Sequence, residues 1–160
     1  MYFVNKKNIL SYILYFSIFA LLFAFYVEFV LGHQPCNLCL LERIPYILSI
    51  VIIIISLIFT KLEKITFIIL GIIFFLATLL SIYHVGIERG LFDESSICEI
   101  SSGLNILDKE LLLKELEKNT ISCKNVTFTI LSLSLATINT FVSLIISLIT
   151  FWIFYNYEKK

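Results

Sequence analysis

Residues His33 to Tyr46 read HQPCNLCLLERIPY, and apolar runs flank this stretch on both sides. Cys36 and Cys39 form a Cys-x-x-Cys pair, and Arg43 follows the second cysteine by about one helical turn. A thiol pair and a fixed cation beside a hydrophobic segment indicate redox chemistry at a membrane surface. The rest of the chain has to supply the partners for that chemistry.

The composition predicts a polytopic membrane protein. Hydrophobic residues make up 59% of the 160 residues, charged residues make up 15%, and the mean hydropathy is +0.98. These values are far from those of soluble domains. The net charge is zero and no basic patch with interleaved aromatics is present, which argues against nucleic-acid binding.

Four apolar runs are long enough to cross about 30 Å of hydrocarbon. They predict an all-α fold, a four-helix transmembrane bundle in a single domain of residues 1–160. The expected spans are residues 9–31, 42–60, 65–83 and 127–155, and the expected external loops are residues 32–41 and 84–126. Leucines fall mostly on one face of residues 108–118, which predicts a short amphipathic helix on the membrane surface or on the protein's own outer surface.

The basic residues predict the orientation of the bundle. Lysines gather in three short segments beside span ends on one side: Lys6, Lys7, Lys61, Lys64, Lys159 and Lys160. The opposite side also has six Lys or Arg residues, but over loops about three times longer in total. The positive-inside rule therefore places both termini in the cytoplasm and both cysteine-bearing loops outside, where thiols can be oxidised.

Polar side chains inside the apolar runs need partners. Glu28 is the only charge in the first run, where it either reaches back to the interface or lies near a bound headgroup. Polar residues stud the fourth run, among them Ser132, Ser134, Thr137, Asn139, Thr140 and Ser143. Interhelical hydrogen bonds are the usual explanation for such residues.

The cysteines form two separated pairs, Cys36 with Cys39 and Cys98 with Cys123. Such pairs fit disulfides in an oxidising compartment, and they would also fit a four-thiolate metal site. The second pair is either a structural staple worth roughly 3 kcal/mol or an exchangeable disulfide that passes electrons to the first pair. A relay needs a final acceptor, and an apolar pocket beside Arg43 suits a lipid-soluble quinone.

Helical geometry suggests how the first pair is activated. A helix N-terminus at the Cys-x-x-Cys motif favours a thiolate. Arg43 lies at i+4 from Cys39, so on a continuous helix both side chains face the same direction. The cation would then stabilise a Cys39 thiolate or an anion formed next to it.

The segment Pro35 to Pro45, PCNLCLLERIP, resembles the signature of the DsbB family of disulfide-generating membrane proteins. The resemblance extends over nearly the whole chain, with the first pair in the short external loop and the second in the long one. Tyr83 to Glu88, and Leu133 to Ala136 with Asn139, are weaker family segments. Two residues depart from the family pattern: Ile138 stands where relatives often have tryptophan, and Glu28 is an unusual charge.

The resemblance implies a role for each cysteine. Cys98 would accept attack by a reduced DsbA-like periplasmic partner, and Cys123 would then attack Cys36. Cys39, released as a thiolate, would contact the quinone, and Arg43 would hold the quinone oxygen. Two electrons would leave as quinol into the quinone pool and the respiratory chain.

The resemblance also implies the surroundings of the site. It places the protein in the bacterial inner membrane, with cytoplasmic termini and both pairs on the periplasmic side. Because the partner is strongly oxidising, the acceptor should be ubiquinone rather than menaquinone. His84 and Glu88 are candidates to border the quinone, with anchoring at the interface as the alternative, and no metal is expected.

Three alternatives lead to other functions. A vitamin K epoxide reductase type would have the two pairs in the reverse order. A zinc or copper site with four cysteine ligands is disfavoured because Cys98 and Cys123 are far apart and His33 is the only near imidazole. A non-catalytic scaffold stapled by disulfides would leave Arg43 and the Cys-x-x-Cys pair without a role.

Overall fold

The computed structural model describes residues 6–93, 98, 123–124, 128–130 and 133–157. Its elements in chain order are α1 (Lys6–Phe29), α2 (Asn37–Leu41), α3 (Ile44–Ile58), η1 (Thr60–Leu62), α4 (Glu63–Glu88), β1 (Thr129–Ile130), β2 (Leu133–Ser134) and α7 (Leu135–Tyr155). Four segments are long and apolar enough to cross a membrane, with α2 and α3 counted as one. This confirms the predicted all-α, four-helix membrane fold. The amphipathic helix predicted at residues 108–118 lies outside the described residues.

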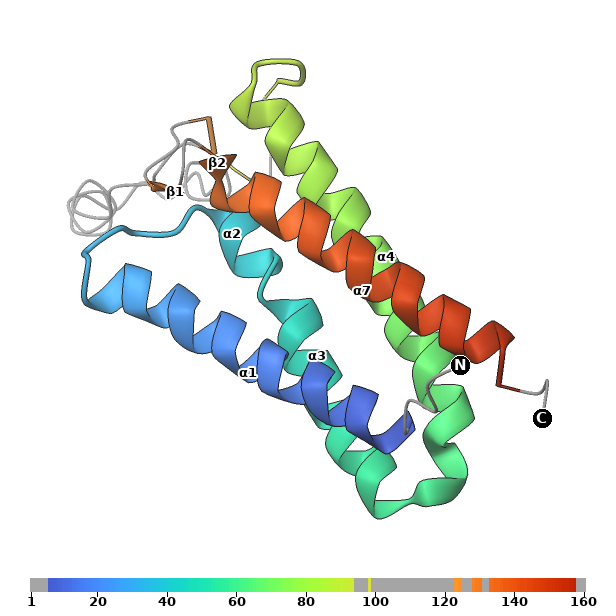
Figure 1. Ribbon diagram of the computed structural model, residues 1–160. Coiled ribbons are helices and arrows are strands. Elements are labelled where there is room, and N and C mark those ends of the chain that lie inside the picture. The colour runs from blue at the N-terminus through green and yellow to red at the C-terminus, as the bar shows by residue number, and fades with distance from the viewer. Residues whose placement is uncertain (1–5, 94–97, 99–122, 125–127, 131–132, 158–160) are drawn as a thin grey trace, which may run out of the picture.

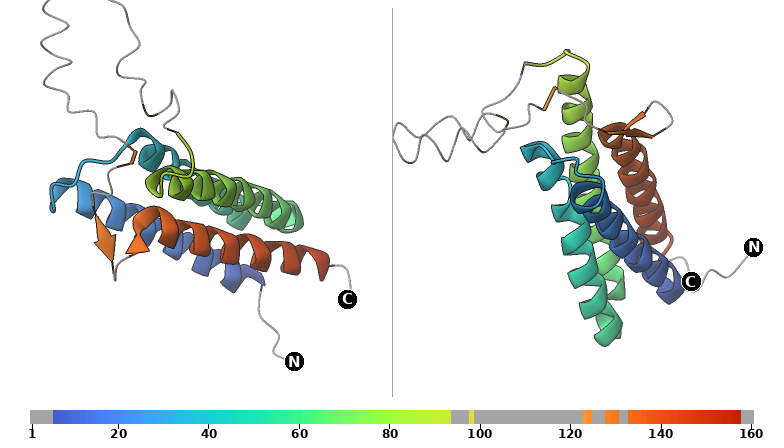
Figure 2. Two further views of the ribbon diagram at one scale, coloured as in Figure 1. Left: turned by 90° about the horizontal axis from the view of Figure 1, so that it is seen from above. Right: turned by 90° about the vertical axis from the view of Figure 1, so that its left-hand side faces the viewer.

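The helices pack as two pairs, α1 against α3 and α4 against α7 (Figure 1). Helix α4 follows α3 through the short η1 turn and runs antiparallel to α7 (Figure 2). The Lys64 ammonium lies 5.8 Å from the Phe154 ring, so the start of α4 meets the end of α7. Helix α2 and the β1–β2 hairpin lie at the opposite end of the bundle (Figure 1).

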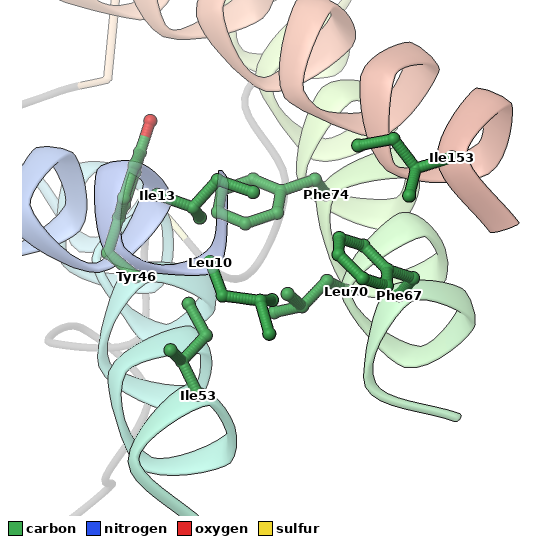
Figure 3. Packing of buried hydrophobic residues seen from close by; sticks show 8 residues of the cluster. All are labelled: Leu10, Ile13, Tyr46, Ile53, Phe67, Leu70, Phe74 and Ile153. Carbon is green, nitrogen blue, oxygen red and sulfur yellow. The ribbon is translucent and has the colours of Figure 1, made fainter. Parts of the chain in front are cut away.

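A cluster of buried apolar side chains joins all four spans nearer the η1 end of the bundle (Figure 3). Its members are Leu10, Ile13, Tyr46, Ile53, Phe67, Leu70, Phe74 and Ile153. The outward faces of the same helices are also apolar, as exposed Leu148 and Val51 illustrate. Such an exterior suits a lipid environment, and packing between helices must then rest on more than hydrophobicity.

Small and hydroxylated residues line the contact between α4 and α7. The Ser147 hydroxyl donates to the Gly71 carbonyl at 3.1 Å, and the Thr78 hydroxyl donates to Ser143 Oγ at 3.1 Å. Closer to the hairpin, the Ser81 hydroxyl donates to the Ala136 carbonyl at 2.8 Å. These bonds bring the two backbones close together, as is usual for helices in membranes.

The polar residues of the fourth span divide into two groups. Ser143 and Asn139 bond to other helical segments, as predicted. Ser134 instead caps α7 by accepting from the Thr137 amide, and Thr140 bonds to a carbonyl within α7. Ser132 lies outside the described residues.

Two helices differ in extent from the approximate spans predicted for them. Helix α4 continues to Glu88 instead of ending at residue 83, because the bundle buries His84 and Ile87 and gives His84 a polar partner. Helix α7 begins at Leu135 instead of residue 127. Before it, Thr129 and Ile130 pair antiparallel with Ser134 and Leu133, as β-branched and apolar residues often do.

The second span is divided into two helices just after the Cys-x-x-Cys motif. Helix α2 ends at Leu41, and α3 begins at Ile44 with a proline in its first turn. Pro45 has no N–H to bond the Leu41 carbonyl, and its ring clashes with that carbonyl in a continuous helix. Glu42 and Arg43, between the two helices, keep backbone angles in the right-handed helical region.

The close approach of α4 and α7 can be tested at Gly71. A Cβ at this position would lie 3.0 Å from the Phe151 ring, so Gly71→Leu should force the helices apart. Overpacking of this kind costs about 1–3 kcal/mol. We expect a lower thermal unfolding temperature in detergent for Gly71→Leu. We expect little change for Ile72→Leu at the next position, because the Ile72 side chain is exposed. Equal stability of the two variants would contradict a tight α4–α7 contact.

Candidate functional site

The two thiols of the Cys-x-x-Cys motif meet at the start of α2. Cys36 is the N-cap residue, and its sulfur accepts a hydrogen bond from the Cys39 backbone N–H at 3.3 Å. The two sulfurs lie 2.9 Å apart, and both thiols are free. Cys36 is buried and Cys39 is partly exposed. The local fold therefore holds the two sulfurs in a position to react with each other.

The surroundings of Cys36 favour its thiolate. A hydrogen bond from the Cys39 thiol is the main cause that lowers the pKa of Cys36 to about 4, and burial opposes this shift. The His84 imidazole, whose Nε2 lies 3.5 Å from Cys36 Sγ, lowers this pKa further. The reduced pair therefore presents an anionic sulfur on Cys36 at neutral pH.

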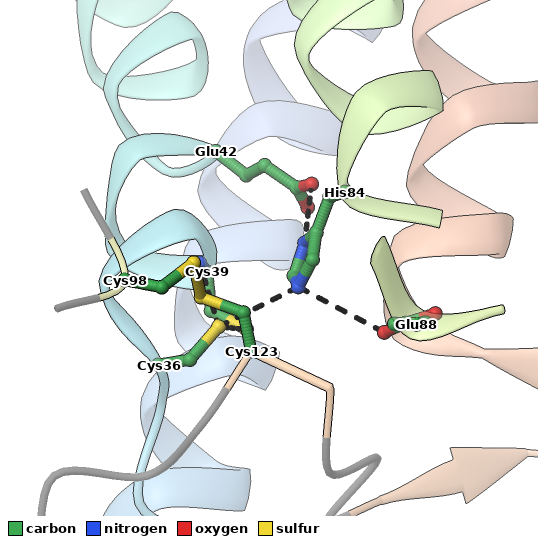
Figure 4. Close-up of a disulfide and its surroundings, with 7 residues drawn as sticks. All are labelled: Cys36, Cys39, Glu42, His84, Glu88, Cys98 and Cys123. Carbon is green, nitrogen blue, oxygen red and sulfur yellow. Dashed lines mark hydrogen bonds and ion pairs between the residues drawn. A yellow bond between two sulfur atoms is a disulfide. The ribbon is translucent and has the colours of Figure 1, made fainter. Parts of the chain in front are cut away.

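A carboxylate from the helix break organises the polar groups behind the thiols. Glu42 Oε1 lies 2.9 Å from His84 Nδ1, and Glu42 Oε2 accepts from Asn139 Nδ2 at 3.0 Å (Figure 4 shows the His84 contact). The Tyr46 hydroxyl in turn donates to Asn139 Oδ1 at 2.5 Å. This network ties α3, α4 and α7 to the segment that follows α2. It also fixes the orientation of the imidazole beside Cys36.

The second cysteine pair packs directly against the first. Cys98 and Cys123 are joined in a disulfide, and both are buried. They form one cluster with Cys36, Leu38 and Ile87 (Figure 4 draws all four cysteines). Residues from the two predicted external loops thus meet at one place.

Arg43 lies on the cavity side of the bundle and pairs with a residue of α1. Its Nη1 donates to Glu28 Oε2 on α1 at 2.6 Å, and its guanidinium lies 5.2 Å from the centre of the Phe25 ring. Glu28, which sequence left between two interpretations, is therefore the ion-pair partner of Arg43.

A cavity of about 350 Å³ connects these groups. Its walls are mainly apolar and aromatic side chains of α1 and α7, and they include Ile138. Its polar lining includes both free cysteines together with Arg43, His84 and Glu88. An apolar cavity with a few convergent polar groups is the usual form of a small-molecule site.

The structure thus brings together the seven site residues predicted from the sequence, which are Cys36, Cys39, Arg43, His84, Glu88, Cys98 and Cys123. Cys36, Cys39 and Cys123 line the cavity, and Cys98 lies behind Cys123 in the buried cluster. His84, a candidate to border the quinone or to anchor at the interface, is 2% exposed and bound to Glu42.

Sequence reasoning missed the part that Glu42 plays. Its signal was a carboxylate three residues after Cys39 at the start of an apolar run, where a charge needs a partner. The partners, His84 and Asn139, are far away in the chain. Their polarity alone did not indicate that they converge on one carboxylate.

Comparison with known proteins supports a common origin for this arrangement. A family model described as "Disulfide bond formation protein DsbB" matches residues 6–153. The chain is also 39% identical over 94 residues to "Uncharacterized protein RP370" of Rickettsia prowazekii (strain Madrid E). That match covers 56% of this chain and 55% of the relative, so it spans about half the length of the curated relative. No solved structure matches the chain.

The low pKa of Cys36 predicts an unusual pH profile of alkylation. In reduced protein carrying Cys98→Ser and Cys123→Ser, the rate of Cys36 alkylation by iodoacetamide should be flat from about pH 6 to pH 8. It should fall only as the pH approaches about 4, where the thiolate is protonated. Peptide mass spectrometry measures the modification at Cys36.

Cys39→Ala supplies the matched control, because it removes the main cause of the shift. The pKa of Cys36 should then rise, and alkylation at pH 6 should slow by more than about tenfold. A rate that climbs steadily from pH 6 to pH 9 before this substitution would contradict a stabilised thiolate.

Proposed function

The chain belongs to the DsbB family of disulfide bond formation proteins, which are multi-pass membrane proteins, and we propose that it passes electrons from protein thiols to a membrane quinone. It would be a quinone-dependent protein-disulfide oxidoreductase. The donor would be a reduced, soluble DsbA-like protein on the periplasmic side. The observation that carries the proposal is the packing of both cysteine pairs in one buried cluster beside the cavity.

The first step is exchange with the protein donor. A thiolate of the partner attacks Cys98, the Cys98–Cys123 bond breaks, and Cys123 leaves as a thiolate. The partner's second thiolate then attacks the mixed disulfide, which releases Cys98 and leaves the partner oxidised. The pair has gained two electrons, and the partner has lost two.

The second step moves the electrons between the pairs. When Cys36 and Cys39 are joined, the Cys123 thiolate attacks Cys36 and Cys39 leaves as a thiolate. Cys98 then attacks Cys123, which restores the Cys98–Cys123 disulfide and releases Cys36 reduced. The structure has this composition, with a Cys98–Cys123 disulfide and free thiols at Cys36 and Cys39. It corresponds to the state in which the Cys36–Cys39 pair is reduced and has not yet passed its two electrons to the quinone.

The chain's residues have suitable chemistry to hold a quinone headgroup. The aromatic and aliphatic walls suit its ring, and Arg43 and His84 offer N–H groups to its oxygens. A bound quinone would supply the acceptor for two electrons and two protons, and it would leave as quinol. Formation of the Cys36–Cys39 bond releases those electrons.

The charged groups around the cavity would control charge during the transfer. Arg43 lies at the cavity and carries a permanent positive charge, of which Glu28 neutralises a part. His84 and Glu88 are 3.9 Å apart and could carry protons toward the acceptor. Because the donor in this proposal is strongly oxidising, ubiquinone is favoured over menaquinone.

The proposed orientation places the cysteine end of the bundle in the periplasm of a bacterial inner membrane. The η1 turn with Lys61 and Lys64, and both ends of the chain, would then lie on the cytoplasmic side. The positive-inside rule and the need for an oxidising compartment support this choice.

Quinone consumption tests the proposed reaction. Purified protein is mixed with a reduced thioredoxin-like partner and a soluble ubiquinone analogue, and quinone absorbance is followed. We expect turnover in the native protein and its loss, by at least about a hundredfold, in Cys39→Ser, because the Cys36–Cys39 disulfide can no longer form. Equal consumption by the two proteins would refute the oxidase function. Circular dichroism of both proteins checks that the serine variant is folded.

Arg43 offers a separate test of the quinone-binding part of the proposal. Arg43→Met keeps much of the apolar stem but removes the charge, so the KM for quinone should rise about tenfold. The matched control is Arg89→Met at the exposed C-terminus of α4, which should leave the KM unchanged. A similar KM in both variants would show that Arg43 does not hold the quinone.

A further inference from the structure

We propose that the reduced Cys36–Cys39 pair and His84 form a binding site for a thiophilic divalent cation such as Zn²⁺. The site differs from the four-cysteine metal site weighed from the sequence, because two of its ligands are replaced by one imidazole. It also departs from the expectation that the protein holds no metal. The inference goes beyond the proposed function and requires neither quinone nor a protein partner.

The ligand atoms already lie at distances close to those of a zinc site. The two sulfurs and one imidazole nitrogen are all within 4.8 Å of one another. Tetrahedral zinc places a sulfur and a nitrogen ligand about 3.6 Å apart, and Cys36 Sγ and His84 Nε2 are 3.5 Å apart. Two sulfur ligands would be about 3.8 Å apart, against 2.9 Å between Cys36 and Cys39. A small rotation of the partly exposed Cys39 side chain would supply the difference.

The imidazole is oriented as a metal ligand would need. Glu42 Oε1 accepts a hydrogen bond from the His84 Nδ1–H group at 2.9 Å. Nε2 is therefore the nitrogen directed at the sulfur of Cys36. Metal-bound histidines usually donate their other N–H to a carboxylate or a carbonyl, which fixes the ring and raises its basicity. Glu42 is itself held by Asn139 at 3.0 Å. These buried contacts preorganise the imidazole for metal binding.

Glu88 lies near the imidazole but outside the group of three ligand atoms, so water would take the fourth position. It lies one turn after His84 on α4, and its Oε1 is 3.9 Å from His84 Nε2. Two thiolates, an imidazole and a water molecule are ligands that zinc accepts. The buried Cys36 and His84 would exclude competing water from one side of the ion.

Binding of this kind depends on the redox state. Zinc would use both sulfurs, and the same sulfurs bond to each other in the oxidised pair. The ion would therefore bind only the reduced protein, and it would hold the pair reduced until it is removed. A bound thiophilic metal would reversibly prevent oxidation of the Cys36–Cys39 pair.

The test titrates Co²⁺ into detergent-solubilised full-length protein carrying Cys98→Ser and Cys123→Ser. Sulfur-to-cobalt charge-transfer absorption and tetrahedral d–d bands report the ligands, and Zn²⁺ should displace the cobalt. We expect one ion per chain in the reduced protein and none after oxidation of Cys36 and Cys39. Absence of binding to the reduced protein, or equal binding after oxidation, would overturn the proposal without involving quinone activity.

Matched variants identify the ligands in the same background. His84→Ala and Glu42→Gln should each weaken binding by at least about tenfold, the second because it alters the group that orients the imidazole. His33→Ala replaces the other histidine of the chain and should leave binding unchanged. Retained affinity in His84→Ala, or cobalt bands that appear only when Cys98 and Cys123 are present, would refute the site. The redox comparison needs no variant of the ligands, so it does not depend on whether His84→Ala folds.

Discussion

The cysteine end of the bundle depends on one buried carboxylate. Glu42 is 8% exposed and lies in an otherwise apolar region, where an unpaired charge is costly by several kcal/mol. Its two oxygens are taken by His84 of α4 and Asn139 of α7. The interaction therefore sets the distance between three chain segments and, through His84, the surroundings of Cys36. Removing this carboxylate would leave two buried polar groups without their partner.

The remaining architecture explains why a cavity exists beside this network. Helices α4 and α7 are held together by small residues and hydroxyl bonds, while α1 packs mainly on α3. At the η1 end the four spans share one apolar cluster, but at the cysteine end α1 and α7 face the cavity. The tightly packed α4–α7 pair thus holds the thiols and the imidazole in place. The less enclosed α1 supplies the apolar wall with Glu28 and Phe25.

Hydropathy was sufficient to predict the spans because it reports transfer into lipid, and the family segment indicated which cysteines matter. Hydropathy could not predict that α4 continues past Tyr83, because His84 and Glu88 are compensated by groups from other parts of the chain. The i+4 argument concerned only Cys39 and Arg43, so it could not predict that Glu28 of α1 pairs with the guanidinium. Glu42 was visible as a charge, but its partners lie 42 and 97 residues away, and the sequence did not indicate that they converge on this carboxylate.

The capping position of Cys36 makes the chemistry of the motif part of the helix itself. In the reduced protein the Cys36 sulfur accepts the Cys39 amide and closes the first turn of α2. A disulfide sulfur is a much weaker acceptor, so oxidation removes that cap, which is worth about 1 kcal/mol. For a two-electron couple this corresponds to about 20 mV in favour of the reduced form. The N-cap of this five-residue helix therefore favours the reduced pair and makes the Cys36–Cys39 disulfide a somewhat stronger oxidant.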